Sequence, residues 1–63
     1  MDAVEHLVPP RLFGLRAAAR YLGIEPRSVQ RLVGQGELRP VRLGVRRVLF
    51  DRQDLDRLIR RSR

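Results

Sequence analysis

Residues 15–36 read LRAAARYLGIEPRSVQRLVGQG and carry the strongest structural signal in the chain. Its first eight residues place small and aliphatic side chains at helical spacing, which predicts an amphipathic helix over residues 15–22. The side chains on the inner face of that helix are Leu15, Ala18, Ala19 and Leu22. Gly23 is suited to end the helix, because glycine adopts a left-handed conformation without strain.

A second helix is predicted directly after a short turn. Pro26 favours the first helical position and Glu25 the capping position before it, so the helix should run from residue 26 to about residue 35. Gly36 should stop it, and Ile24 should fill the angle between the two helices. A turn of this length sets the helices steeply across each other, as in a helix-turn-helix.

The second helix has two faces of different chemistry. At about 100° per residue, Leu32 and Val33 fall beside Val29. The opposite face carries Arg27, Gln30 and Arg31, with Gly34 near its end. The aliphatic face should therefore pack on the first helix, which leaves the basic face free to contact another molecule.

After residue 38 the apolar spacing changes from helical to alternating. Residues 41–43 and 47–50 are predicted to pair as a two-stranded hairpin, called the wing (residues 41–50), with a turn at Gly44, Val45 and Arg46. Asp51 and Asp54 have the spacing of an acidic capping box and open a last helix from residue 52 to about residue 61. Its buried side chains should be Leu55, Leu58 and Ile59.

The predicted fold is therefore mainly α with a small β-hairpin, in the order of a winged helix-turn-helix. Its 63 residues allow one domain, which we place at residues 12–61. Residues 1–11 contain Pro9 and Pro10 and are predicted to form a tail or strap, and residues 62–63 a basic end. No cysteine and no long apolar stretch occur, so we expect a soluble protein of a reducing cytoplasm.

The charge points to a polyanionic partner. Fourteen arginines and no lysine stand against seven acidic residues, which gives a net charge of +7 and a pI near 11.7. Arginine suits forked contacts to phosphates and guanine edges, although codon usage in a GC-rich genome also produces arginine in place of lysine. The net positive charge is the same whether the arginines reflect DNA contacts or codon usage.

A helix followed by a basic wing is the pattern of a protein that reads double-stranded DNA. The candidate DNA contacts are Arg27, Ser28, Gln30 and Arg31 on the second helix, Arg42, Arg46 and Arg47 on the wing, and, as weaker phosphate contacts, Arg16 and Arg20. The alternatives are solvated helix faces and, on the wing, charges that protect an exposed strand edge. The sequence does not assign the faces of Arg42 and Arg47.

Catalysis is not expected. His6 is the only histidine and lies in the predicted tail, so Ser28 has no base beside it. The acidic residues of the last helix are explained by capping and by its solvent face. We therefore predict no enzyme activity, metal, cofactor or small-molecule ligand.

Residues 12–59 resemble the small excisionase-type DNA-binding domains of the MerR-like winged-helix group. The matching stretches are LRAAARYLGI at 15–24, RSVQRLV at 27–33, GEL at 36–38, VRLG at 41–44, and Asp51 with Leu55. The chain differs at Ala17, where the family often has glutamate, and at residues 25–26, where it often has a serine cap followed by basic residues. It also lacks the aromatic residue common near residues 47–49, where Phe50 can take over the packing.

The resemblance implies a recombination directionality factor. Such a protein binds beside a phage or mobile-element attachment site in the bacterial cytoplasm, associates with the nucleoid, bends DNA cooperatively with further copies of itself, and directs an integrase towards excision. The main alternative is a small MerR-like transcriptional regulator acting at promoters. A basic RNA- or protein-interaction module is disfavoured, because three aromatic residues give no stacking platform for single-stranded RNA.

Overall fold

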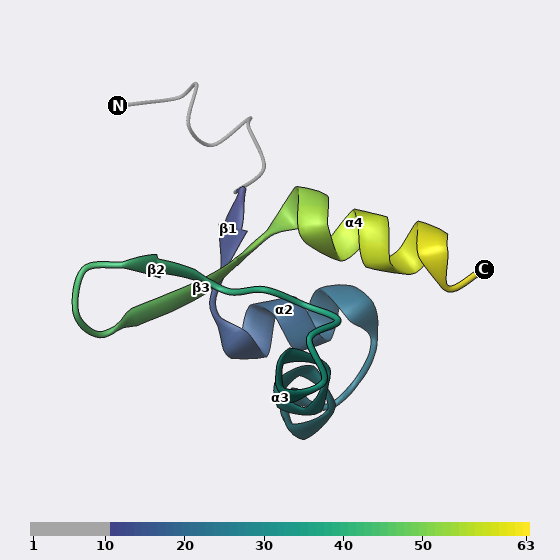
Figure 1. The fold of residues 1–63 in the computed structure, drawn as a ribbon, viewed down its shortest axis with the longest axis horizontal. Helices are drawn as coiled ribbons and strands as arrows, with labels where there is room; N and C mark the ends of the chain where they lie inside the picture. The colour runs from purple at the N-terminus through teal and green to yellow at the C-terminus, as the bar shows by residue number, and fades with distance from the viewer. Residues whose placement is uncertain (1–10) are drawn as a thin grey trace.

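The computed structural model describes residues 11–63 (Figure 1). Within them the elements follow in the order β1 (Leu12–Phe13), α2 (Leu15–Leu22), α3 (Pro26–Gly34), β2 (Val41–Leu43), β3 (Arg47–Asp51) and α4 (Arg52–Arg61). The strands form one antiparallel sheet in the order β1-β3-β2. The winged helix-turn-helix prediction is confirmed, whereas the tail predicted for residues 1–11 lies outside the described residues except for Arg11.

Helices α2 and α3, which form the helix-turn-helix, begin at the residues predicted from the sequence, Leu15 and Pro26. Gly23 ends α2 in the left-handed conformation, with φ 75°, and its N–H donates to the carbonyl oxygens of Ala19 and Arg20. Pro26 opens α3 after an extended Glu25, whose side chain makes no capping hydrogen bond. Helix α3 ends at Gly34, one residue earlier than expected.

The core forms around α2, which packs against α3, α4, β1 and β3. Figure 1 shows α2 between α3 on one side and α4 on the other. The small side chains of Ala18 and Ala19 are buried, which allows the neighbouring elements to approach the α2 backbone closely. The other buried apolar side chains are Val29, Leu38, Phe50, Leu55 and Leu58.

Ile24, which the sequence predicts to fill the angle between α2 and α3, is only partly covered in the structure. Its side chain is 38% exposed. It lies at the edge of a shallow apolar hollow, which also involves Leu32 and the α4 residue Ile59. The turn is instead held by the backbone, because the N–H of Ile24 donates to the carbonyl oxygen of Ala19 at 3.0 Å.

The sheet has three strands where the sequence predicted two. Strand β1 pairs with the end of β3, with Leu12 opposite Asp51 and Phe13 opposite Phe50. Beside this pair, Arg11 forms an ion pair with Asp51 at 3.2 Å. A two-residue strand has no period that could reveal it, so only the long-range pairing identifies β1.

Asp51 caps α4 as predicted, but only half of the capping box forms. Its Oδ1 accepts a hydrogen bond from the backbone N–H of Gln53 at 2.9 Å. Asp54 pairs with Arg57 at 2.9 Å, one turn along the helix. A shorter aspartate at this position does not make the reciprocal contact of glutamate in the usual capping box.

Replacing Leu55 with alanine tests the core. Leu55 is 0% exposed, so Leu55→Ala should lower the free energy of unfolding by about 2–5 kcal/mol. That loss is comparable with the total stability of a domain this small, and the variant should be largely unfolded. Urea denaturation followed by circular dichroism measures it. The control is Leu43→Ala, 49% exposed, which should change stability by less than about 0.5 kcal/mol; equal losses in both variants would contradict this core.

The cap of α4 should make stability depend on pH. Hydrogen bonds from Arg11 and from the backbone N–H of Gln53 hold the pKa of Asp51 below its ordinary value. The stabilisation is complete above the ordinary pKa of an aspartate and is lost as the pH falls through the lowered pKa. Asp51→Asn keeps a capping oxygen but removes the charge. The melting temperature of the wild-type protein should therefore exceed that of Asp51→Asn at neutral pH and equal it in acid. A difference in melting temperature that does not depend on pH would contradict this.

Candidate nucleic-acid interface

The side chains of α3 divide as the sequence predicted. Val29 is 0% exposed and packs in the core, while Leu32 and Val33 are half-buried against it. Arg27, Gln30 and Arg31 are exposed on the opposite side. Ser28, at the start of the helix, is half-buried. Helix α3 thus offers solvent a surface of two guanidinium groups and one amide.

The strand register assigns the two arginines that the sequence left open. Arg42 lies opposite Val48, and Leu43 lies opposite Arg47. Because successive side chains of a strand point to opposite faces, Arg42 and Val48 share a face with the buried Phe50. Arg47 lies on the other face of the wing. Only Arg42 is therefore on the face that meets the core.

A hollow of about 300 Å³ connects α3 with the wing. Its apolar lining comes from the start of α2, the end of α3 and the wing, and the polar side chains beside it are Gln30 and Arg42. The complete lining is Leu15, Gln30, Val33, Pro40, Arg42, Val48 and Phe50. The structure thus brings one predicted contact of α3 together with one of the wing.

The remaining candidates lie outside this hollow. Arg16 and Arg20 are exposed on α2, and Arg46 is exposed in the turn of the wing. Arg47 is exposed on the wing face away from Phe50. These side chains therefore widen the basic surface without lining the hollow.

No carboxylate of residues 11–63 forms an ion pair with a candidate arginine. Within residues 11–63, the ion pairs are Arg11 with Asp51, Arg57 with Asp54 and Arg61 with Glu37. None of these involves an arginine predicted to contact DNA. A surface of one sign with no bound counter-charge attracts a polyanion and raises its association rate.

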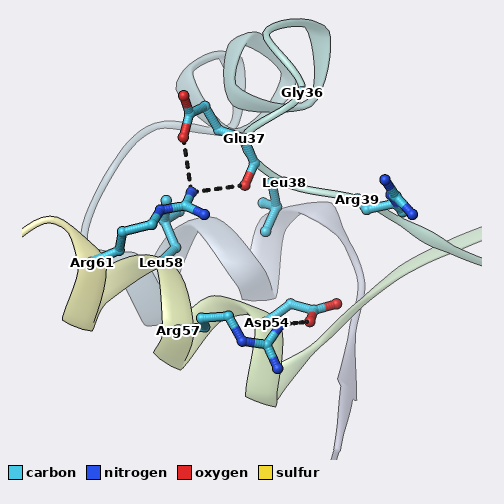
Figure 2. A pocket seen from close by; sticks show the side chains of 8 residues that line it. All are labelled: Gly36, Glu37, Leu38, Arg39, Asp54, Arg57, Leu58 and Arg61. Atoms are coloured by element: carbon cyan, nitrogen blue, oxygen red, sulfur yellow. Dashed lines mark hydrogen bonds and ion pairs between the residues drawn. The ribbon is translucent and has the colours of Figure 1, made fainter.

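A second pocket, of about 310 Å³, lies between α4 and the segment that follows α3 (Figure 2). One Nη atom of Arg61 donates to Oε1 of Glu37 at 2.8 Å and to its carbonyl oxygen at 3.3 Å. Figure 2 shows Arg61 reaching from α4 to Glu37, with the Arg57–Asp54 pair on the same helix. These contacts fix the chain where it leaves α3, and the pairing leaves this pocket less basic than the α3 surface.

Tyr21 supplies another link between helices that the sequence did not indicate. Its hydroxyl donates to the carboxylate of Asp56, and this hydrogen bond raises the pKa of Tyr21. Its ring lies 5.2 Å from the ring of Phe13. Tyr21 therefore connects α2 with both α4 and β1. Because Tyr21 and Asp56 are far apart in the sequence, no local pattern of residues predicts their contact.

No helix in residues 11–63 is long and apolar enough to cross a membrane. In the same part of the chain, no group of three or more histidine, cysteine, aspartate or glutamate side chains could hold a metal ion.

A family model described as a helix-turn-helix domain matches residues 12–63. The match covers α2, α3, the wing and α4. No curated protein matches the chain.

The two faces of the wing should differ in their contribution to DNA binding. Arg42→Ala should weaken binding more than Arg47→Ala, because only Arg42 shares the hollow with Gln30. Both side chains are exposed and carry the same charge, so each variant is the control for the other. Gel-shift titrations of duplex DNA measure the dissociation constants. Equal losses, or a larger loss for Arg47→Ala, would contradict the assignment of faces.

Proposed function

We propose that this chain, which belongs to the helix-turn-helix domain family of sequence-specific DNA-binding domains, inserts α3 into the major groove. The observation that carries the proposal is the position of Gln30 and Arg42 on one hollow between α3 and the wing. A protein with a helix in the major groove and a wing beyond it must straddle one sugar-phosphate strand. That strand would pass over the hollow between α3 and the wing, facing its two polar side chains, Gln30 and Arg42.

The contacts to bases are assigned to the exposed side of α3. Arg27 and Arg31 have the fork geometry that binds the O6 and N7 atoms of guanine, and Gln30 can bind adenine in the same bidentate way. Each such pair contributes about 1–3 kcal/mol of discrimination between bases. Ser28, near the start of the helix, is assigned to a phosphate.

The wing and α2 are assigned to the DNA backbone. Arg42, Arg46 and Arg47 would contact phosphates on the far side of the straddled strand. Arg16 and Arg20 would contact phosphates beside α2. These contacts carry no sequence information and should depend strongly on salt.

The biological role that we propose is that of an excisionase, an architectural protein that directs an integrase. A domain of this size buries little surface on DNA, so binding by several copies at adjacent sites is the natural route to affinity. Copies packed along the duplex would bend it. The resemblance of residues 12–59 to excisionase-type domains supports this role over that of a promoter-bound regulator with the same fold.

Substitutions should separate base contacts from phosphate contacts. Arg27→Ala and Arg31→Ala should each weaken binding to a selected duplex by about 5- to 100-fold, with a much smaller effect on scrambled DNA. Arg46→Ala should weaken binding to both duplexes equally and reduce the salt slope by about one. Gel shifts at two salt concentrations measure this. Equal losses on both duplexes for Arg27→Ala would remove the base-reading role of α3.

A recombination assay tests the biological role. Where an integrase gene lies beside this gene, excision of the element by that integrase should rise sharply when the protein is added, and Arg27→Ala should abolish the increase. The Arg60→Ala variant, altered at an exposed arginine of α4 outside the proposed DNA contacts, is the matched control and should remain active. Unchanged excision, together with binding at promoters, would favour the transcriptional regulator instead.

A further inference from the structure

The end of the wing exposes an unusual side chain. Val45 is 97% exposed, and Leu43, at the end of β2, is 49% exposed. The turn is tight, because Leu43 pairs directly with Arg47 and Gly44 adopts a φ of 75°. Val45 is the middle residue of this three-residue turn. The fold therefore holds an aliphatic side chain at the outermost point of the wing.

Charged side chains surround this aliphatic tip. Arg46 follows Val45, and Arg47 lies at the start of β3; both are exposed, and neither forms an ion pair with a carboxylate of residues 11–63. Figure 1 shows the turn of the wing projecting away from the three helices, so no described element covers it. Such a tip fits a partner that is anionic at its rim and apolar inside.

The minor groove of DNA has this chemistry. Phosphates line both rims, while deoxyribose and base edges form the walls and floor. Guanine alone places a donor, its N2 amino group, on that floor, whereas A·T and T·A pairs present acceptors. An aliphatic side chain neither donates nor accepts a hydrogen bond, so it leaves the minor-groove acceptors of every base pair without a partner. Guanine under the tip would add one further desolvated, unsatisfied group, its N2 donor, and this donor makes the difference between the pairs.

We propose that Val45 enters the minor groove and selects A·T or T·A pairs at the base step beneath the wing. The proposal rests on the proposed placement of α3 in the neighbouring major groove. It adds a second point of sequence selection, one that excludes guanine and does not distinguish A·T from T·A. Arg46 anchors the tip to the phosphate rim and contributes equally for every base pair.

Modified bases test the contact directly. In a duplex enriched from a random library by this protein, the A·T pair beneath the wing is replaced by G·C, by inosine·C, or by 2,6-diaminopurine·T. Inosine is guanine without the N2 amino group, and diaminopurine is adenine with one. G·C and diaminopurine·T should weaken binding by about tenfold or more, whereas inosine·C should stay within about twofold of A·T because it restores the acceptor-only floor.

Variants of the tip identify the side chain responsible. Val45→Ser supplies a hydroxyl that accepts from the N2 amino group, so the penalty for G·C should fall to less than about twofold. Val45→Ile should keep the penalty. Arg46→Ala should weaken all four duplexes by the same factor. Circular dichroism should show native folding in each variant, because both positions are exposed.

Three results would overturn the proposal. The first is that Val45→Ser binds the G·C duplex as poorly, relative to A·T, as the wild-type protein does. The second is that the weaker binding to G·C disappears in Arg46→Ala but persists in Val45→Ser. The third is a loss of cooperative binding in Val45→Ser with base preference intact, which would place the tip against another copy of the protein. Arg27→Ala on duplexes altered at the major-groove positions separates this proposal from the proposed function: if it leaves the preference at every such position unchanged, the placement of α3 fails instead.

Discussion

The structure depends on the packing of one side of α3 against the alanines of α2. Ala18 and Ala19 are buried and small, so Val29 can enter the core without exposure. This contact fixes the rotation of α3 about its own axis. Once the aliphatic side is inside, the helical period leaves Arg27 and Arg31 no position except the outer surface. The basic surface is thus a consequence of how the core is filled.

The wing gains its position from the same core. Phe50 is buried beside α2, and the alternation along β3 then places Val48 and its partner Arg42 on the face towards α3. Directly after α3, the contact of Arg61 with Glu37 joins the outgoing chain to α4. Helix and wing are therefore held on either side of one hollow, which gives a single duplex two points of contact.

The sequence predicts the helices because periodic side chains and helix-ending residues give local signals, as at Gly23 and Pro26. It does not predict β1, which is two residues long, or the links of Tyr21 to Asp56 and of Arg61 to Glu37, which join distant segments. The exposed face of α3 follows from periodicity. The side of the wing on which Arg42 lies does not, because it depends on the strand register.

The most direct test of the account is a nuclear magnetic resonance titration of the ¹⁵N-labelled protein with a duplex enriched from a random library. The account predicts that the largest shifts fall on the amide and side-chain signals of Arg27, Gln30 and Arg31, followed by those of the wing. The amide of Val29 should exchange slowly both without and with DNA, because the core does not open. Shifts confined to α4, with α3 unaffected by DNA, would contradict the claim that the outer side of α3 reads the duplex.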